Sequence, residues 1–178
     1  MSSHQLETTN AVHVVKFTEG KRKLDSFFYP LDRPAPQITG KLVDFYNLWQ
    51  NTRKDGKLPS WKDFSFENFV GWHSKMRVME TGKDINDVKH NIIVGETFAK
   101  YWGRNTLYDQ IQSANPPTQD TINKYYQHLG HLYNKHYCIS AGIIPNEDGS
   151  LCSTTWIELP LADNGKDVSH FIAAILAV

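Results

Sequence analysis

The sequence carries no excess of charge of either sign. Its 178 residues include 19 Lys and Arg and 19 Asp and Glu, so the formal net charge is zero. Proteins that attract nucleic acid or anionic membranes through their overall field are strongly basic. The one basic run, EGKRKLD at 19–25, is short. We interpret it as a solvated segment, because a nucleic-acid site needs clustered basic residues with interleaved aromatics. No nucleic-acid partner is expected.

Long apolar runs and a targeting signal are also missing. A run such as FIAAILAV at 171–178 is far shorter than the about 20 residues that span a bilayer. The start, MSSHQLETTN, has neither the basic residues nor the apolar stretch of a secretion signal. The chain has the length of about one domain, with 40% hydrophobic and 21% charged residues. We therefore expect a cytoplasmic protein with no membrane partner.

Cysteine is scarce. The two cysteines, Cys138 and Cys152, fall in predicted strands that are joined by a turn at 145–149. A turn there places Ile144 beside Ser150, which leaves the two cysteines several residues out of register. That offset is too large for a disulfide. We expect two buried free thiols.

Phosphate-binding and nucleophile motifs are missing as well. The segment NIIVGETFAKYWGRN at 91–105 has two glycines but no Lys followed by Ser or Thr, which a phosphate-binding loop requires. It also lacks the Gly-x-Ser-x-Gly of a nucleophile elbow. We interpret the segment as a strand-to-helix corner, in which Gly95 allows the turn and Glu96 occupies the first turn of the helix.

Two long segments show helical periodicity. The first begins after Gly40 and ends near the Gly and Pro of RKDGKLP, and the second runs from the start signal at 116–118 to Lys135. Short helices are expected at 65–72 and 96–102. The apolar faces of the two long helices consist of Leu42, Phe45, Tyr46 and Trp49, and of Ile122, Tyr125, Tyr126, Leu129, Leu132 and Tyr133.

The rest of the domain is predicted to contain five strands. Lys75–Glu80 and Val88–Val94 are expected to pair, and three closing strands follow at 137–144, 150–159 and 168–177. Helices grouped between hairpin-connected strands favour the α+β class, with an antiparallel sheet and helices on one face.

Residues 1–39 are predicted to form an extension that precedes a domain at 40–178. AVHVVKF at 11–17 is a strand candidate, and the prolines of FFYPLDRPAPQ at 27–37 interrupt regular structure. The extension is expected to cover the domain or to reach a partner. We also expect it to be helical in part, and the protein to form a homodimer through that helix or through the sheet.

Four short motifs, in this order, resemble those of a known family. They are R-x-x-G-x-L-P-x-x-x-D-F at 53–64, a strand that ends in a Val-Gly corner, an aromatic followed by Gly-Arg-Asn, and L-P-L-x-D-x-G at 159–165. From about Gly40 to Val178 the chain resembles the bacterial PAS-like sensory domain family, long carried as an uncharacterised family. The residues that carry the resemblance are Trp49, Arg53, Gly56, Leu58, Pro59, Asp63, Phe64, Ile93, Val94, Gly95, Trp102, Gly103, Arg104, Asn105, Leu159, Pro160, Leu161, Asp163 and Gly165.

The resemblance implies a five-stranded antiparallel sheet in the order 2-1-5-4-3, with the central helices over one face and a pocket between helices and sheet. It implies a stand-alone, non-catalytic sensor domain that binds an unidentified small molecule or a signalling protein. Aromatic and polar residues on the central helices and facing strands are the expected ligand-binding residues. They are Tyr101, Trp102, Tyr125, Tyr126, Cys138, Thr155 and Trp156.

The histidines leave one alternative open. His128 and His131 are three residues apart, so they share a helix face and are candidates for a metal site or for an axial ligand of haem. No acidic residue lies within the segment 128–138, and both histidines lie beside the apolar stripe of the helix. A haem- or metal-binding sensor is therefore a secondary hypothesis.

A small cone-shaped α+β enzyme of the isomerase or dehydratase type is the other alternative. Such an enzyme needs an acid or a base inside an apolar pocket. Residues of suitable type are present, but no spacing singles out a pair, and we expect a protein that is not an enzyme. The candidates are His73, Asp87, His90, Glu158 and His170.

Overall fold

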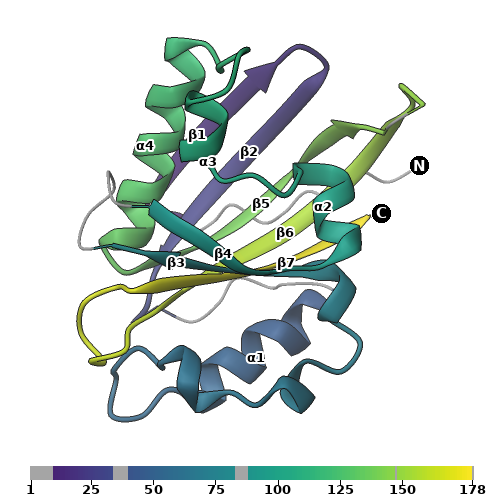
Figure 1. The fold of residues 1–178 in the computed structure, drawn as a ribbon. Helices are drawn as coiled ribbons and strands as arrows, with labels where there is room; N and C mark the ends of the chain where they lie inside the picture. Colours follow the sequence, from purple (N-terminus) through teal and green to yellow (C-terminus); the bar gives the residue numbers. More distant parts are fainter. Residues whose placement is uncertain (1–9, 34–39, 83–87, 147, 178) are drawn as a thin grey trace.

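The computed structural model describes residues 10–33, 40–82, 88–146 and 148–177, with the side chains at 88–90, 107 and 108 left out. Within these residues, seven strands form one antiparallel sheet in the order β1-β2-β5-β6-β7-β3-β4 (Figure 1). The strands are β1 (His13–Glu19), β2 (Arg22–Pro30), β3 (Met76–Thr81), β4 (Val88–Val94), β5 (His136–Pro145), β6 (Leu151–Leu161) and β7 (His170–Ala177).

The N-terminal extension contributes a β-hairpin to this sheet. β1 pairs with β2, and β2 pairs along its length with β5. The strand expected at 11–17 is confirmed, but the helix expected in the extension is wrong for its described residues, 10–33. Leu24, Ser26 and Phe28 are buried at a period of two, which is the spacing of a strand with one covered face. The hairpin also makes the prediction of five strands wrong.

The strands outside the hairpin have the order β4-β3-β7-β6-β5. Numbered along the chain, this is the order 2-1-5-4-3 that the family resemblance implies. The predicted antiparallel pair of β3 and β4 and the predicted run of three closing strands are both confirmed. The α+β class and this strand order therefore hold, and the hairpin extends the sheet beyond β5.

Helices cover both faces of the sheet, so the prediction of one covered face is wrong (Figure 1). Successive side chains of a strand point to opposite faces. Tyr137 on β5 contacts the rings of Tyr46 and Trp49 in α1 (Leu42–Thr52). The next residue, Cys138, lies close to His128 of α4 (Gln119–Tyr133). The central helices α4 and α2 (Glu96–Trp102) thus lie on one face and α1 on the other.

The predicted positions of the helices are largely confirmed. SFENFVGW at 65–72 contains only a 3₁₀ turn, at Phe66–Phe69. None of the helices in the described part of the chain is long and apolar enough to cross a membrane. The α-helices are α1 (Leu42–Thr52), α2 (Glu96–Trp102), α3 (Leu107–Ile111) and α4 (Gln119–Tyr133).

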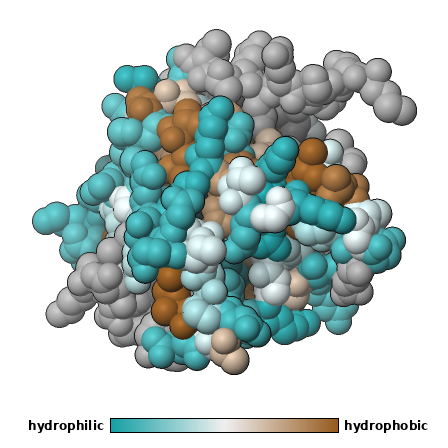
Figure 2. Space-filling model, turned by 90° about the horizontal axis from the view of Figure 1, so that it is seen from above, coloured by the Kyte–Doolittle hydropathy of each residue, from teal (hydrophilic) through white to brown (hydrophobic). Residues whose placement is uncertain are grey.

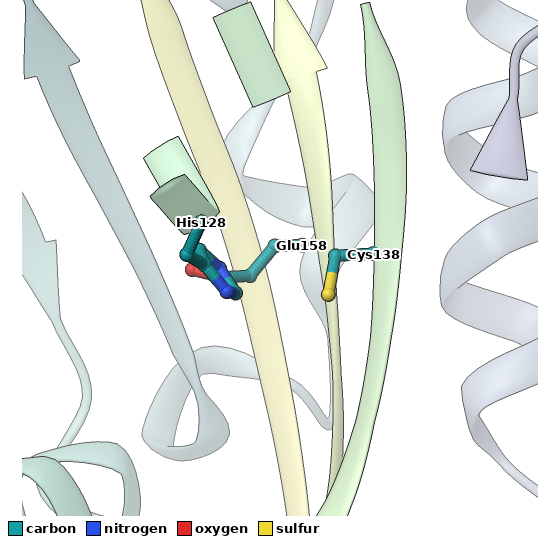
Figure 3. A group of neighbouring side chains, drawn as sticks. All are labelled: His128, Cys138 and Glu158. Carbon is teal, nitrogen blue, oxygen red and sulfur yellow. The ribbon is translucent and has the colours of Figure 1, made fainter. Parts of the chain in front are cut away.

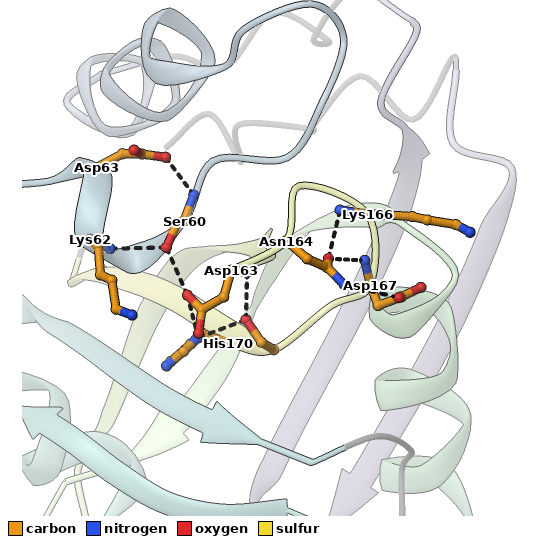
Figure 4. A network of polar contacts seen from close by, with 9 residues as sticks. Ser60, Lys62, Asp63, Asp163, Asn164, Lys166, Asp167 and His170 are labelled. Carbon is orange, nitrogen blue, oxygen red and sulfur yellow. Dashed lines mark hydrogen bonds and ion pairs between the residues drawn. The ribbon is translucent and has the colours of Figure 1, made fainter.

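Two of the four motifs pack against each other (Figure 4). Two backbone hydrogen bonds join residues 58–59 to the loop at 162–165. The Ser60 hydroxyl donates to the Asp163 carboxylate at 2.7 Å, and the Ser60 N–H donates to Asp63 at 2.7 Å. These motif residues therefore fasten the segment after α1 to the β6–β7 connection, which is a structural role.

The hairpin between β5 and β6 closes two residues later than predicted. Asn146 N–H donates to the Ser150 carbonyl at 2.8 Å, so Ile144 pairs with Cys152 instead of with Ser150. The conclusion about disulfides is nevertheless confirmed, because both cysteines are free. Cys138 is buried as expected, whereas Cys152 is only half-buried.

Gly95 is needed for a reason other than the predicted one. The segment 91–105 is a strand-to-helix corner, as expected, and Glu96 begins α2. However, the φ of Gly95 is −67°, which any residue adopts. A Cβ at this position would overlap the backbone of His73 and Ser74. The close approach of two backbone segments therefore requires glycine here.

Gly95→Ala should lower the free energy of unfolding by about 1 to 3 kcal/mol, because backbone atoms must move to admit the methyl group. Urea denaturation measures this change. Gly20→Asn is the control: Gly20 has φ +58° and open space around it, and asparagine tolerates this conformation at a small cost. A Gly95→Ala protein as stable as the control would contradict the prediction.

Candidate functional site

A pocket of about 90 Å³ lies between α4, α2 and the sheet. The surface on this side of the molecule is mostly hydrophilic, with smaller hydrophobic areas (Figure 2). The wall of the pocket is mainly apolar and aromatic, with a few charged side chains. It consists of Val15, Phe17, Leu24, Ser26, Arg77, Met79, Phe98, Trp102, Lys124, Tyr125, His128, Leu129, Trp156 and Glu158.

Local patterns in two elements direct side chains into this pocket. Tyr125, His128 and Leu129 on α4 are spaced at i, i+3 and i+4, so they share one face of the helix. Trp156 and Glu158 on β6 are two residues apart, so they point to the same face of the sheet. Helix and strand periodicity together therefore bring these five side chains to one place.

A buried carboxylate forms the polar end of the pocket. Glu158 is 6% exposed. His128 Nε2 lies 2.5 Å from Oε2 of Glu158, and Arg77 Nη2 lies 3.4 Å from Oε1. Arg77 is on β3, two strand spacings away from β6, or about 9.6 Å. Its side chain bridges this distance past Ala173, the β7 residue that is paired with both Glu158 and Arg77.

Two neighbouring groups keep this carboxylate ionised. Burial on its own raises the pKa of Glu158, because it penalises the charged form. The charge and hydrogen bond of His128, with the charge of Arg77, outweigh burial and lower the pKa of Glu158 to about 2. Glu158 is therefore a hydrogen-bond acceptor at neutral pH, and the proton of its contact with His128 is on Nε2.

Cys138 lies beside this pair. It is the cross-strand partner of Glu158, and one ligand atom each of His128, Cys138 and Glu158 lie within 4.8 Å of one another (Figure 3). Ser140 donates to Ser26 at 2.8 Å, so the Cys138 thiol donates to Ser140 at 3.3 Å. Burial and the charge of Glu158 raise the pKa of Cys138 well above its usual value. Cys138 is therefore a neutral thiol.

His131 does not join His128 in one group. Its ring stacks on His13 of β1 with a centroid distance of 4.2 Å. Burial, His13 and His136 lower the pKa of His131 to about 4, so this ring is neutral at neutral pH and ties β1 to α4. Among the described residues, the group of possible metal ligands around His128 contains Cys138 instead of His131.

Three of the expected ligand-binding residues line the pocket. They are Trp102, Tyr125 and Trp156, and the two tryptophan rings meet edge to face at 5.1 Å. Thr155 precedes Trp156 on β6, so its side chain points to the other face of the sheet. The expected residues that lie outside the pocket wall are Tyr101, Tyr126, Cys138 and Thr155.

The contribution of the hairpin was missed from the sequence. Val15 is paired with Ser26, and Phe17 with Leu24, which places all four on the pocket face. The alternating pattern of 11–17 was a signal for a strand, but no spacing in the sequence relates this strand to α4. Non-local strand pairing therefore supplies a side of the pocket that sequence patterns do not locate.

The residues considered for catalysis are dispersed. Of those whose side chains the structure describes, Glu158 alone lines the pocket. His73 Nε2 lies 2.9 Å from the Phe66 carbonyl oxygen, and His170 contacts Ser169. The side chains of Asp87 and His90 lie outside the described residues. The acid–base pair that the structure does form, Glu158 with His128, was not identified from the sequence.

Comparisons with known proteins do not show which family the chain belongs to. No protein-family model matches the sequence, and no curated protein matches it. Among solved structures, the chain is similar to an RNA-binding light-oxygen-voltage receptor, with 15% sequence identity and a TM-score of 0.40. The similarity covers 86% of this chain and 38% of the receptor chain. RNA binding is a property of that receptor.

The stabilising contribution of ionised Glu158 should disappear in acid. Because its pKa in the folded protein is lowered to about 2 from an ordinary value of 4.5, this contribution is complete above about pH 4.5 and is lost as the pH falls towards 2. The free energy of unfolding of the protein, relative to Glu158→Gln, should fall over this range by at most about 3 kcal/mol.

Urea denaturation of both proteins between pH 5 and about pH 2.5 measures this difference. Glu19→Gln is the control, because Glu19 is 40% exposed and its ion pair with Arg22 is long, at 3.9 Å. The difference in the free energy of unfolding between the unaltered protein and this variant should change little over the same pH range. If the difference in the free energy of unfolding between the unaltered protein and Glu158→Gln stays constant across this pH range, the prediction for Glu158 is wrong.

Proposed function

We propose that this protein is a PAS-like sensory domain whose pocket binds a small ligand. The observation that carries the proposal is the pocket itself, in which an aromatic wall adjoins a compensated buried charge. Small-molecule sites in proteins typically combine a mainly apolar wall with a few placed polar groups. Trp102 and Trp156 supply the wall, and Glu158 with Arg77 and His128 supplies the polar groups.

The size of the pocket restricts the ligand. Its volume of about 90 Å³ is smaller than the cavity of about 150 Å³ that binds benzene in an engineered protein core. A ligand that fits the pocket as it stands has only a few heavy atoms. A larger ligand extends past Lys124, whose side chain is 32% exposed and lies in the wall.

The proposed signal is a change in the packing of the elements that line the pocket. Phe17 of β1 packs edge to face on Tyr125 of α4, with ring centroids 5.8 Å apart, and both line the pocket. A ligand that prefers one spacing between α4 and the hairpin shifts the population towards that arrangement. The changed surface is then available to a signalling protein.

The pair formed by His128 and Glu158 supports a second candidate function, a small enzyme of the isomerase or dehydratase type. An enzyme of this type needs an acid–base pair inside an apolar pocket. However, a general base works best with a pKa near the working pH, and the pKa of Glu158 is lowered to about 2. The charge arrangement therefore favours binding over proton abstraction by Glu158.

Native mass spectrometry of freshly purified protein tests whether a small molecule is retained, as a discrete added mass. Isothermal titration calorimetry with phenol, benzoate and benzylamine then compares a neutral, an anionic and a cationic aromatic probe, each of which is large enough to extend past Lys124. At least one probe or the retained compound should bind. Trp102→Ala and Trp156→Ala should each weaken that binding about tenfold or more, because each removes an aromatic wall worth about 1.4 kcal/mol.

Trp61→Ala is the matched control, because the Trp61 ring stacks on Phe69 at 5.8 Å, away from the pocket wall. Its affinity for the same compound should be unchanged. Unaltered affinity in both pocket variants would make the pocket assignment wrong. Absence of any bound compound or probe would reject ligand binding and leave a protein-interaction role in its place. Turnover of a ketosteroid-like or hydroxy-acid substrate would instead establish the enzyme.

A further inference from the structure

At the polar end of the pocket, three side chains of different chemistry each place one possible metal-ligand atom within 4.8 Å of the other two. The three are an imidazole nitrogen of His128, the sulfur of Cys138 and a carboxylate oxygen of Glu158 (Figure 3). They come from α4, β5 and β6, so the fold alone brings them together. We infer that these residues form a binding site for a divalent transition-metal ion, with Zn²⁺ as the best match.

The donor set is the basis of this assignment. Zn²⁺ binds imidazole nitrogen, thiolate sulfur and carboxylate oxygen at about 2.0 to 2.3 Å, in tetrahedral geometry. These bond lengths place neighbouring ligand atoms about 3.5 Å apart. The three atoms here are separated by up to 4.8 Å, so modest side-chain rotations bring them to an ion. Mg²⁺ and Ca²⁺ are disfavoured, because they prefer oxygen ligands and gain little from sulfur.

The charge of the cluster also accommodates an ion. Glu158 supplies one negative charge, and Cys138 supplies a second when its thiol proton leaves to solvent, as is usual when a thiol binds a metal. His128 binds an ion through the lone pair of a neutral imidazole nitrogen. A divalent ion is therefore balanced by the two anionic ligands.

Existing hydrogen bonds hold two of the three ligands in place from outside the group. Arg77 Nη2 lies 3.4 Å from Oε1 of Glu158, which leaves Oε2 for the ion. Ser140 lies 3.3 Å from the Cys138 sulfur, and its own proton is directed to Ser26. Ser140 is therefore an acceptor for the thiol. Its reorientation to donate to a thiolate would supply the outer hydrogen bond that metal ligands usually have.

The fourth coordination position faces the pocket. His128 and Glu158 line the pocket, whereas Cys138 lies outside its wall, so water or a small ligand with a donor atom can complete the tetrahedron from the pocket side. Three protein ligands and one open position is the pattern of zinc sites that bind exchangeable ligands. The metal site does not depend on the small-ligand proposal, since the ion binds to the protein alone.

Titration of the metal-free protein with Co²⁺ tests the site directly, because a thiolate bound to Co²⁺ gives a charge-transfer band in the near ultraviolet. Competition with Zn²⁺ should remove that band. Glu158→Gln and His128→Gln keep the thiol and nearly the same shape, and each should weaken Co²⁺ and Zn²⁺ binding by at least about 100-fold, because changes outside the ligand shell alone cost 10- to 100-fold. Cys138→Ala should abolish the band.

Cys152→Ala and His131→Gln are the matched controls, since neither residue belongs to the ligand group. Both should retain the band and the wild-type affinity. Circular dichroism and urea denaturation establish that each variant is folded. Failure of the folded wild-type protein to bind Co²⁺ or Zn²⁺ with a thiolate band overturns the site. A band that survives in Cys138→Ala but not in Cys152→Ala overturns it as well.

Discussion

The buried carboxylate of Glu158 is the constraint on which the pocket side of the structure depends. An uncompensated carboxylate in the interior costs several kcal/mol, so the fold must bring positive charge or strong donors to it. Arg77 reaches it from β3 and His128 reaches it from α4. The position of α4 over β6 therefore satisfies a charge requirement as well as the apolar packing of Leu129 and Leu132.

On the opposite face of the sheet, α1 and the segment after it are held by other contacts, and two of the four family-like motifs supply them. The Trp49 indole of α1 donates to the Pro160 carbonyl at 3.0 Å, and Ser60 donates to Asp163 after the helix. These contacts fix α1 and the segment after it to the end of β6. Trp102 is the motif residue that also lines the pocket. The resemblance therefore concerns mainly the fold, and apart from Trp102 the pocket wall consists of residues that do not carry the resemblance.

Sequence patterns predicted what depends on neighbours along the chain. The periodicity of α1 and α4 and the turn signals of the closing strands were sufficient to place these elements. They did not predict the register of β5 and β6, because the closing hydrogen bond of Asn146 with Ser150 shifts it by two residues. They also did not predict the site. Arg77 and Glu158 meet across an intervening strand, and no spacing in the sequence encodes that distance.

The hairpin and the buried charge depend on each other. Without β1 and β2, β5 would be the edge of the sheet, and Cys138 would border on solvent. β2 places Phe28 opposite Cys138 and Ser26 opposite Ser140, which removes water from the neighbourhood of Glu158. Less water lowers the local dielectric and strengthens each interaction of the carboxylate. A movement of the hairpin that admits water would therefore weaken the interactions of the carboxylate, and under the proposed function a bound ligand would in turn bias the position of the hairpin.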